Sequence, residues 1–477
     1  MPPVTYARGM GRARGAVPLS LLALVLAACS ASGSAEPDAG RSATPAVGPD
    51  ALEKDALRIE HAEDPRLFPA GDGLVVLATR SGERGAPGAV VTATYADGRW
   101  GPVEEVSSGD GDVSGLFATF NDDGVGVAAW TQGDPAGEDR AVARVRDADG
   151  SWSEPTELAG MSYDLDVQVD AAGDVAVSGS GRVAVHPAGG AWRTTRVGDE
   201  SAVTIALDED GGVHAALHEL PRGGGGAIST RYLPPGGSTW STRQPVEVDG
   251  VASSDAVRIL ALPGGAEALV VGTASPNWLS TSDTQIYAST AYQVLRRDAR
   301  GERFAPVWQK DGATRLQAEV RGEDVRLLWL QQTHGTTVDD PDGDRTSAPT
   351  QVDLTALTLG GQERVLADTE VRPATADASE AGTIEAASGS GCTKDAWVWR
   401  PVGVDGVAGD LWVVAGDADG TLHAPGEPVP WGLQASLACA AGDRAWLARV
   451  EDAEVREAAS DLDDPELLDS AVVVAPL

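Results

Sequence analysis

Apolar and polar residues alternate in short runs along most of the chain, and a turn rich in glycine and aspartate precedes each run. Alternation with a period of two places the apolar side chains on one face of a β-strand. The runs begin at Leu74, Val125, Val175, Val213, Ala268, Val325, Ala396 and Ala445. Their spacing of about 50 residues is typical of repeats built from four short strands. The sequence therefore predicts a repetitive all-β architecture over residues 55–477.

The second repeat shows the plan of one unit. Its segments are strand 116–120, turn 121–124, strand 125–131, loop 132–139, strand 141–146, turn 147–150 and strand 152–158. Strands joined in this way form a four-stranded antiparallel meander. A series of such meanders predicts an all-β fold, a β-propeller of four-stranded antiparallel blades. Eight units favour eight blades, and seven is the alternative.

The first 28 residues read as a targeting segment. Arg8, Arg12 and Arg14 precede the apolar stretch 16–28, which is too short to span a bilayer and fits the apolar part of a signal peptide. The stretch ends in Leu26-Ala27-Ala28-Cys29, which resembles the lipobox of bacterial lipoproteins. That resemblance implies cleavage before Cys29 and attachment of lipid, including palmitate, to Cys29. The alternative is an ordinary secretory signal cleaved at a small residue.

Composition adds a tether and excludes one class of partner. Residues 29–54 are small, polar and rich in proline and glycine, so we expect a lipidated Cys29 followed by a flexible tether. With 72 acidic against 36 basic residues, the formal net charge of the chain is −36. A surface of that charge argues against nucleic acid as a partner. We therefore expect an extracytoplasmic protein, anchored by lipid to the bacterial cell membrane, with a propeller domain at 55–477. The strong preference for Arg over Lys suggests a GC-rich genome of the actinobacterial type.

Tryptophans and turns recur with the repeat. Aromatic residues at a repeat period are usually core, so we expect most of the 13 tryptophans to fill the spaces between neighbouring blades. The Gly-x-Trp turns loosely resemble the Asp-box of sialidase-type propellers, Ser-x-Asp-x-Gly-x-Thr-Trp. The nearest segment is Gly237-Ser-Thr-Trp240, but Pro235 and Leu233 stand where that motif has Asp and Ser. The resemblance implies a repeat class and brings no catalytic residue with it.

Long loops mark one end of the predicted propeller. In an antiparallel meander, the loops between second and third strands share an end with the linkers between blades. The extra length falls there, at 275–289, 333–349, 370–382 and 401–409. Binding sites commonly lie on such loops. Within 333–349, the carboxylates of Asp339, Asp340, Asp342 and Asp344 flank Gly343, a pattern that supplies some of the oxygens that calcium needs. A solvated acidic loop is the favoured interpretation, a weak calcium loop is the alternative, and we expect no other cofactor.

Other candidate chemistry is sparse. His214 and His218 have metal-ligand spacing, but four residues along a strand separate them by about 13 Å, so they cannot share an ion. We expect both to be ordinary residues of a strand face. No nucleophile elbow or phosphate loop occurs in the sequence. Cys392 and Cys439, one repeat apart, are candidates for a disulfide between the last two blades. The alternative is two buried free thiols.

These features favour a non-enzymatic protein that binds or scaffolds a protein or glycan ligand through its long-loop face. The alternative is a sialidase-like glycan-active hydrolase, and a structural component of an envelope complex is a third possibility. No catalytic residue can be assigned from the sequence. Three arginine side chains converging at the centre would favour the hydrolase. An exposed apolar patch on the loop face would favour a binding protein.

Overall fold

The structure is a computed structural model, and contacts divide the chain into two units, Met1–Pro45 and Ala46–Leu477. All residues that the structure describes belong to the second unit. They are 55–82, 87–107, 111–133, 139–198, 202–219, 227–249, 251–274, 291–339, 345–370, 384–388, 396–401, 411–415, 421–424, 435–440, 444–451, 454–455, 467–468 and 470–476.

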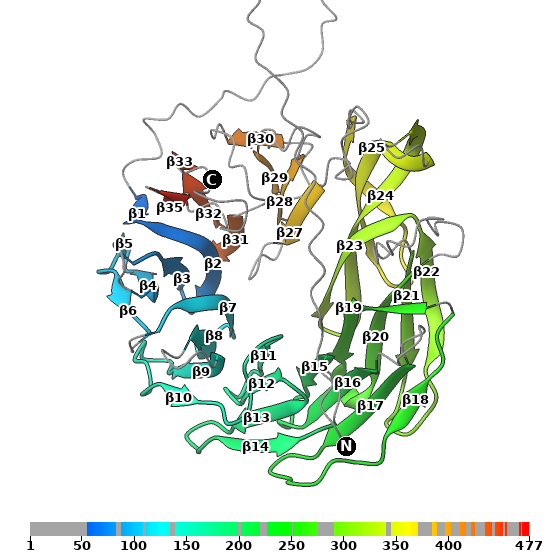
Figure 1. Cartoon of the computed structure of the whole chain (residues 1–477), viewed down its shortest axis with the longest axis horizontal. Coiled ribbons are helices and arrows are strands. Elements are labelled where there is room, and N and C mark those ends of the chain that lie inside the picture. The colour runs from blue at the N-terminus through cyan, green and yellow to red at the C-terminus, as the bar shows by residue number, and fades with distance from the viewer. Residues whose placement is uncertain are drawn as a thin grey trace, which may run out of the picture. The chain divides into compact units, whose positions relative to one another are not determined.

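The described residues form antiparallel sheets, each named below after its second strand (Figure 1). The β3 sheet holds β2 (Ala62–Ala70), β3 (Gly73–Arg80), β4 (Ala89–Ala96), β5 (Arg99–Trp100) and β6 (Glu104–Glu105). The β8 sheet holds β7 (Val113–Phe120), β8 (Gly126–Gly133), β9 (Asp139–Arg146) and β10 (Thr156–Glu157). The β12 sheet holds β11 (Asp166–Val169), β12 (Val175–Gly179), β13 (Arg182–His186) and β14 (Arg193–Arg196). The β16 sheet holds β15 (Ala202–Leu207), β16 (Val213–Glu219), β17 (Ala227–Leu233) and β18 (Gln244–Val246).

The remaining sheets follow the same plan. The β20 sheet holds β19 (Val251–Ala261), β20 (Glu267–Ala274), β21 (Ala291–Arg297) and β22 (Ala305–Asp311), with the 3-10 helix η2 (Pro263–Gly265) in its first turn. The β24 sheet holds β23 (Ala313–Arg321), β24 (Asp324–Asp339), β25 (Arg345–Thr358) and β26 (Arg364–Glu370). The β28 sheet holds β27 (Ile384–Ser388), β28 (Ala396–Pro401), β29 (Leu411–Ala415) and β30 (Thr421–Ala424). The β32 sheet holds β31 (Ala435–Ala440), β32 (Arg444–Glu451), β35 (Ala471–Pro476) and β1 (Leu57–Glu60), and β33 (Glu454–Val455) pairs with β34 (Leu467–Leu468).

This architecture confirms the predicted all-β propeller of antiparallel meanders. The alternating runs lie in or directly before the second strands, β3, β8, β12, β16, β20, β24, β28 and β32. Seven sheets have four strands each, which is consistent with a seven-bladed propeller, the alternative from the sequence. The β3 sheet carries a fifth strand, β6, on β4. A count of eight requires that sheet to be included as a blade, so eight blades stay a prediction. None of the helices in the described ranges has the length and hydropathy needed to cross a membrane.

Both ends of the second unit build the β32 sheet. β1 comes first in the described chain, yet it pairs with β35 near the C-terminus, from Leu57 opposite Val474 to Glu60 opposite Ala471. A single residue, His61, then connects β1 to β2 in the β3 sheet. β2 also contacts β31 and β32, so the last sheet packs against the first. The sheets therefore form a closed series of contacts that is joined at β1.

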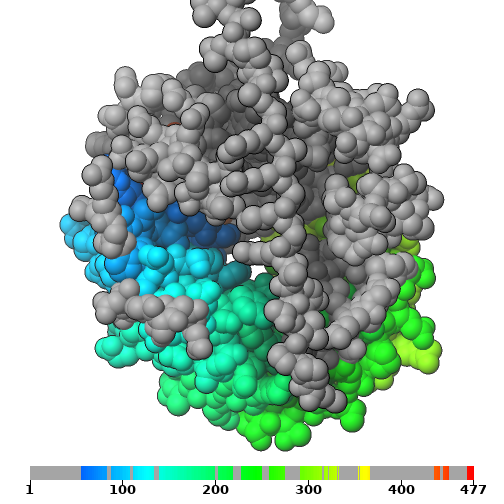
Figure 2. All heavy atoms as spheres, in the orientation of Figure 1, coloured from blue at the N-terminus to red at the C-terminus, as the bar shows by residue number. Residues whose placement is uncertain are grey.

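The core lies between successive sheets, because each sheet presents apolar side chains on both faces. Figure 2 shows the blue, cyan and green parts of the chain packed against one another along the sequence. Trp130, Trp329 and Trp446 are fully buried. They lie in the apolar clusters between the β3 and β8 sheets, the β20 and β24 sheets, and the β32 and β3 sheets, respectively. The predicted role of tryptophan between blades is confirmed for these three residues.

One predicted loop is largely strand. Of the loop expected at 333–349, residues 333–339 belong to β24 and 345–349 belong to β25. The pairs Thr336–Ala348, Thr337–Ser347 and Val338–Thr346 extend the hairpin beyond its neighbours. Threonine and valine favour this extended pairing, which outweighed the turn signals of the segment. The predicted loops at 275–289 and 371–382, and residues 402–409, lie outside the described residues.

Candidate functional site

Most of the sequence-predicted site residues lie at or beyond the edge of the described chain. Cys29 lies outside it. Asp339 ends β24, while Asp340, Asp342 and Asp344 are outside, so the calcium loop stays a prediction. Within the described ranges, no group of three or more His, Cys, Asp or Glu side chains is arranged to hold a metal ion. Cys439 on β31 is buried and disulfide-bonded. Its predicted partner, Cys392, lies outside the described residues, so that pairing also stays a prediction.

His214 and His218 both lie on β16 and are buried, with 1% and 2% of their surface exposed. Their placement on one strand is as predicted from their spacing. The environment of His214 was not predicted. Its Nδ1 lies 2.8 Å from Glu267 Oε1 of the neighbouring β20 sheet, and its Nε2 lies 3.2 Å from Asp208 Oδ2. His214 is thus held between two carboxylates, one on each side of its ring.

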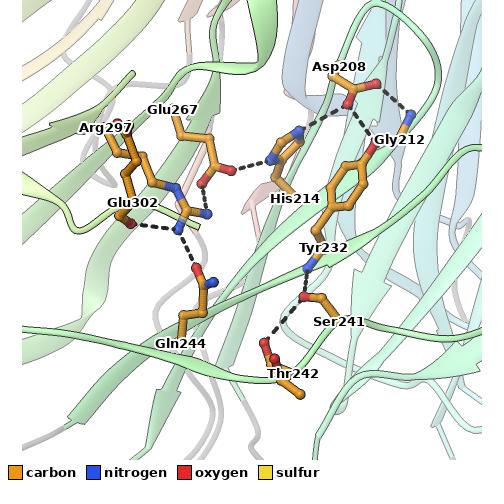
Figure 3. Close-up of polar contacts among 10 residues, drawn as sticks. All are labelled: Asp208, Gly212, His214, Tyr232, Ser241, Thr242, Gln244, Glu267, Arg297 and Glu302. Atoms are coloured by element: carbon orange, nitrogen blue, oxygen red, sulfur yellow. Dashed lines mark hydrogen bonds and ion pairs between the residues drawn. The ribbon is translucent and has the colours of Figure 1, made fainter. Parts of the chain in front are cut away.

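Five residues form what we call the β16–β20 polar cluster: Asp208, His214, Tyr232, Glu267 and Arg297 (Figure 3). The Tyr232 hydroxyl donates to Asp208 Oδ2 at 3.1 Å, and its ring lies 4.8 Å from the His214 ring. Arg297 Nη2 donates to Glu267 Oε2 at 2.5 Å. The cluster runs from the first turn of the β16 sheet to the third strand of the β20 sheet. It therefore connects two sheets through charged side chains.

The turn at 208–212 positions the carboxylate of Asp208. Asp208 Oδ1 accepts hydrogen bonds from the backbone N–H groups of Asp210 at 3.1 Å and Gly212 at 2.7 Å. Aspartate favours such turns because its side chain can replace a backbone acceptor. Gly212 has no space for a side chain, since a Cβ atom would clash with the Tyr232 hydroxyl and the Asp208 carboxylate. The local sequence therefore directs Asp208 Oδ2 toward His214 and Tyr232.

Arg297 is anchored on several sides at the other end of the cluster. Its Nη1 donates to Gln244 Oε1 at 2.5 Å and to the backbone carbonyl of Glu302 at 3.5 Å. Its guanidinium lies 4.5 Å from the centre of the Phe304 ring. Arg297 stands directly opposite Glu267 on the paired strand, so the register of β20 and β21 brings the two charges together.

The cluster lowers the pKa values of both carboxylic acids. Burial raises the pKa of Glu267, but the hydrogen bond and charge of His214 and the charge of Arg297 outweigh it, and the pKa is lowered. Burial also raises the pKa of Asp208, but the Gly212 N–H, His214 and Tyr232 outweigh it and leave that pKa lowered too. Both side chains are therefore ionised at neutral pH. Burial and the charge of Asp208 raise the pKa of Tyr232, which keeps its hydroxyl a donor.

This arrangement is suited to holding sheets together and not to catalysis. A general base needs a free nitrogen within reach of substrate. Both nitrogens of His214 face carboxylates, and only 1% of its surface is exposed. The Arg300 guanidinium lies 4.1 Å from the centre of the Tyr232 ring. The cluster is a buried ionic contact between the β16 and β20 sheets.

Sequence reasoning identified His214 but missed its partners. Asp208 precedes it by six residues across a Gly-Gly turn, so Asp208 begins the turn that leads into β16 and His214 is the second residue of that strand. This signal was available. Glu267 is 53 residues away, about one repeat, and no local pattern connects it to His214. The contact arises only from packing between sheets.

A sialidase-like hydrolase would bring arginine side chains together. Two arginines on first strands, Arg66 and Arg258, bear on this expectation. Arg66 on β2 pairs with Asp64 of its own strand at 3.0 Å. Arg258 on β19 exerts its charge on Asp166 of β11, whose Oδ2 also accepts a hydrogen bond from Ile205 N–H at 2.8 Å. These contacts, in the part of the chain that the structure describes, do not bring arginines together. They give the hydrolase no positive support.

The lowered pKa values predict a specific dependence of stability on pH. Asp208 and Glu267 have pKa values in the folded protein below their ordinary values of 3.8 and 4.5. Their contribution to stability is therefore complete above those ordinary values and is lost as pH falls through the lower folded values. We expect the stability difference between the wild type and Glu267→Gln to be constant from pH 7 to about pH 5 and to shrink below about pH 4. Urea unfolding at each pH measures it, and a difference that grows on acidification would contradict the assignment.

Comparison with known proteins adds little to this geometry. No protein-family model matches the chain, and no curated protein matches it. Among solved structures, a protein of unknown function from Dyadobacter fermentans has a TM-score of 0.38 and 11% identity, covering 89% of this chain and 98% of its own. The β-propeller domain of the trilobed protease from Pyrococcus furiosus has a TM-score of 0.42 and 9% identity, covering 76% and 97%. The SapL1 lectin, solved with α-methyl fucoside, has a TM-score of 0.36 and 13% identity, covering 78% and 97%. None of these similarities carries an argument about function.

Proposed function

We propose that the protein is a lipid-anchored, extracytoplasmic β-propeller that binds a protein or glycan ligand without catalysis. The observation that carries this proposal is the β24–β25 hairpin. β23 pairs with β24 up to Gln331, and β26 pairs with β25 from Gln351 onward. Beyond these residues, β24 and β25 continue together to the pair Asp339–Arg345. The hairpin thus extends past its own sheet as a two-stranded arm.

The position of this arm supports a binding role. It joins the second and third strands of its sheet, so it lies at the end predicted to hold the long loops. A two-stranded arm exposes unpaired backbone groups along both edges, and such edges readily pair with another chain. The side chains of the β16–β20 polar cluster contact one another between two sheets, so they are not presented to a ligand. Binding by projecting segments on a rigid scaffold is therefore the function that these features support best.

The arm can be removed to test this proposal. Soluble protein comprising residues 46–477 would be screened on a glycan array and in pull-downs from envelope extracts. In a matched variant, residues 334–349 are replaced by Asn-Gly, so that Thr333 and Thr350 are joined by a short hairpin turn. We expect at least a roughly tenfold loss of affinity for any ligand found, with an unchanged melting temperature. Undiminished binding by the variant, or release of free sugar from a bound glycan by the wild type, would contradict the proposal.

Anchoring is tested separately with Cys29→Ala. We expect this substitution to move the protein from the membrane fraction to the soluble fraction, because lipid on Cys29 is the proposed attachment. Fractionation after a high-salt wash measures the distribution, since salt removes proteins held only by charge. Ser30→Ala serves as the matched control and should stay with the membrane. Retention of Cys29→Ala in washed membranes would show that the attachment lies elsewhere.

A further inference from the structure

The turns between first and second strands are equivalent in three neighbouring sheets. The first turn residue donates its N–H to a carbonyl four residues later: Asn121 to Val125 at 2.9 Å, Asp170 to Asp174 at 3.0 Å, and Asp208 to Gly212 at 2.9 Å. Asn121, Asp170 and Asp208 therefore occupy one structural position in the β8, β12 and β16 sheets. Their side chains can be compared atom by atom.

In two of the three turns, both terminal atoms of that side chain are bonded. Asn121 Oδ1 accepts from the Val125 N–H at 3.0 Å, and its Nδ2 donates to the Asp170 carbonyl at 3.0 Å. Asp208 Oδ1 accepts from Gly212, and its Oδ2 accepts from the Tyr232 hydroxyl and faces His214. In the β12 sheet, Asp170 Oδ1 accepts from the Asp174 N–H at 2.9 Å, but the buried Oδ2 has no hydrogen-bond partner. Asp170 is only 9% exposed, so water cannot readily replace that partner.

A second carboxylate lies beside this oxygen. Asp174 Oδ1 accepts a hydrogen bond from the Ala188 N–H at 2.7 Å. Its Oδ2 occupies the place that a Cβ atom on Gly211 would need, and Asp170 Oδ2 lies 3.8 Å from that same place. Gly211 has a φ of +80°, so the backbone of the next sheet approaches both oxygens without a side chain between them. Two carboxylate oxygens thus face one backbone turn.

Neighbouring side chains do not neutralise this pair. Asp174 places a second negative charge beside Asp170, because an oxygen of each carboxylate faces Gly211. His186 lies opposite Val175, the residue that follows Asp174 in the chain. A positive charge on the His186 ring would stabilise the ionised form of Asp174. However, burial lowers the pKa of His186, so the ring is neutral at pH 7. A buried carboxylate oxygen without a hydrogen-bond partner is destabilising unless a proton or a cation compensates its charge.

We propose that Asp170 and Asp174 form a binding site for a divalent cation of calcium type at the junction of the β12 and β16 sheets. Calcium accepts carboxylate, backbone carbonyl and water oxygens in flexible geometry. Two carboxylates match its charge, and backbone carbonyls and water would complete the coordination. This proposal is independent of the calcium loop predicted from the sequence at Asp339–Asp344.

The test is thermal unfolding of the full-length protein with calcium chloride or with EDTA. Two variants copy the β8 turn: Asp170→Asn reproduces Asn121, and Asp174→Val reproduces Val125. Asp123→Asn removes an exposed acid from the β8 turn and is the matched control. We expect calcium to raise the melting temperature of the wild type and the control by about 2 °C or more, and to leave both turn variants unchanged.

A further variant separates the two acidic regions. Asp340→Asn/Asp342→Asn, in the acidic segment identified from the sequence, should retain the full calcium response. In EDTA, Asp170→Asn should be at least as stable as the wild type, because it removes the repulsion from Asp174. The proposal is overturned if the wild type shows no calcium response, or if the response persists in both turn variants. Because either turn variant alone can report the loss, failure of one to fold does not remove the test.

Discussion

Replacing Glu267 with alanine is expected to reduce the free energy of unfolding by about 3–5 kcal/mol. The Glu267 side chain is fully buried and accepts from Arg297 while contacting His214. Its removal takes the carboxylate partner from the buried Arg297 and leaves His214 with Asp208 alone, which costs more than the ion pair contributes. Urea unfolding at pH 7 measures the loss. Glu302→Ala is the control, because Glu302 contacts Arg297 through its backbone carbonyl and its side chain is exposed.

A companion variant distinguishes lost charge from lost packing. Glu267→Gln keeps the volume and removes the charge, so it should recover a part of the stability lost in Glu267→Ala. A loss below about 1 kcal/mol in Glu267→Ala would mean that the cluster contributes no more than an exposed ion pair. The stability of the contact between the β16 and β20 sheets would then come from apolar packing alone.

Replacing Trp446 with alanine should have an effect of the same size at another sheet interface. Trp446 is fully buried between the β32 and β3 sheets. Its ring lies 4.5 Å from that of Tyr95 and 5.9 Å from that of Trp100, measured between centres. Truncation removes this aromatic packing and leaves a cavity, for which we expect a loss of about 3–5 kcal/mol. Because the interface joins the last sheet to the first, the loss should appear in global unfolding.

Denaturant unfolding monitored by far-UV circular dichroism measures this loss. Tyr163→Ala is a matched control, since Tyr163 is 54% exposed and its truncation should change stability by no more than about 0.5 kcal/mol. Trp446→Phe retains an aromatic ring and should fall between the wild type and Trp446→Ala. Equal stability of Trp446→Ala and Tyr163→Ala would show that the closing interface contributes little to the folded state.

Local sequence patterns predicted the strands of the repeat and the buried positions within them. The alternating run that begins at Val125 became β8, and the buried position of Trp130 followed from its place in the repeat. The β24–β25 arm was missed because its strands are fixed by pairs across the hairpin, such as Thr337 with Ser347, while its sequence also carries turn residues. The contact between His214 and Glu267 was missed because it depends on how two sheets pack. Alternation determines strands, but it does not specify which strand faces lie together.

The pairing of β1 with β35 has a mechanical consequence. Any tension applied to the N-terminal segment enters the second unit at β1, which is held by four residue pairs to β35. Asp55 reinforces the entry point, because its carboxylate lies 3.3 Å from Arg444 Nη2 and its carbonyl accepts from Trp100 Nε1 at 3.0 Å. Tension along the strand would load all four pairs together, whereas tension across it would peel them one after another. The direction of pull on a tethered molecule would therefore decide whether the joined sheet resists force or opens first.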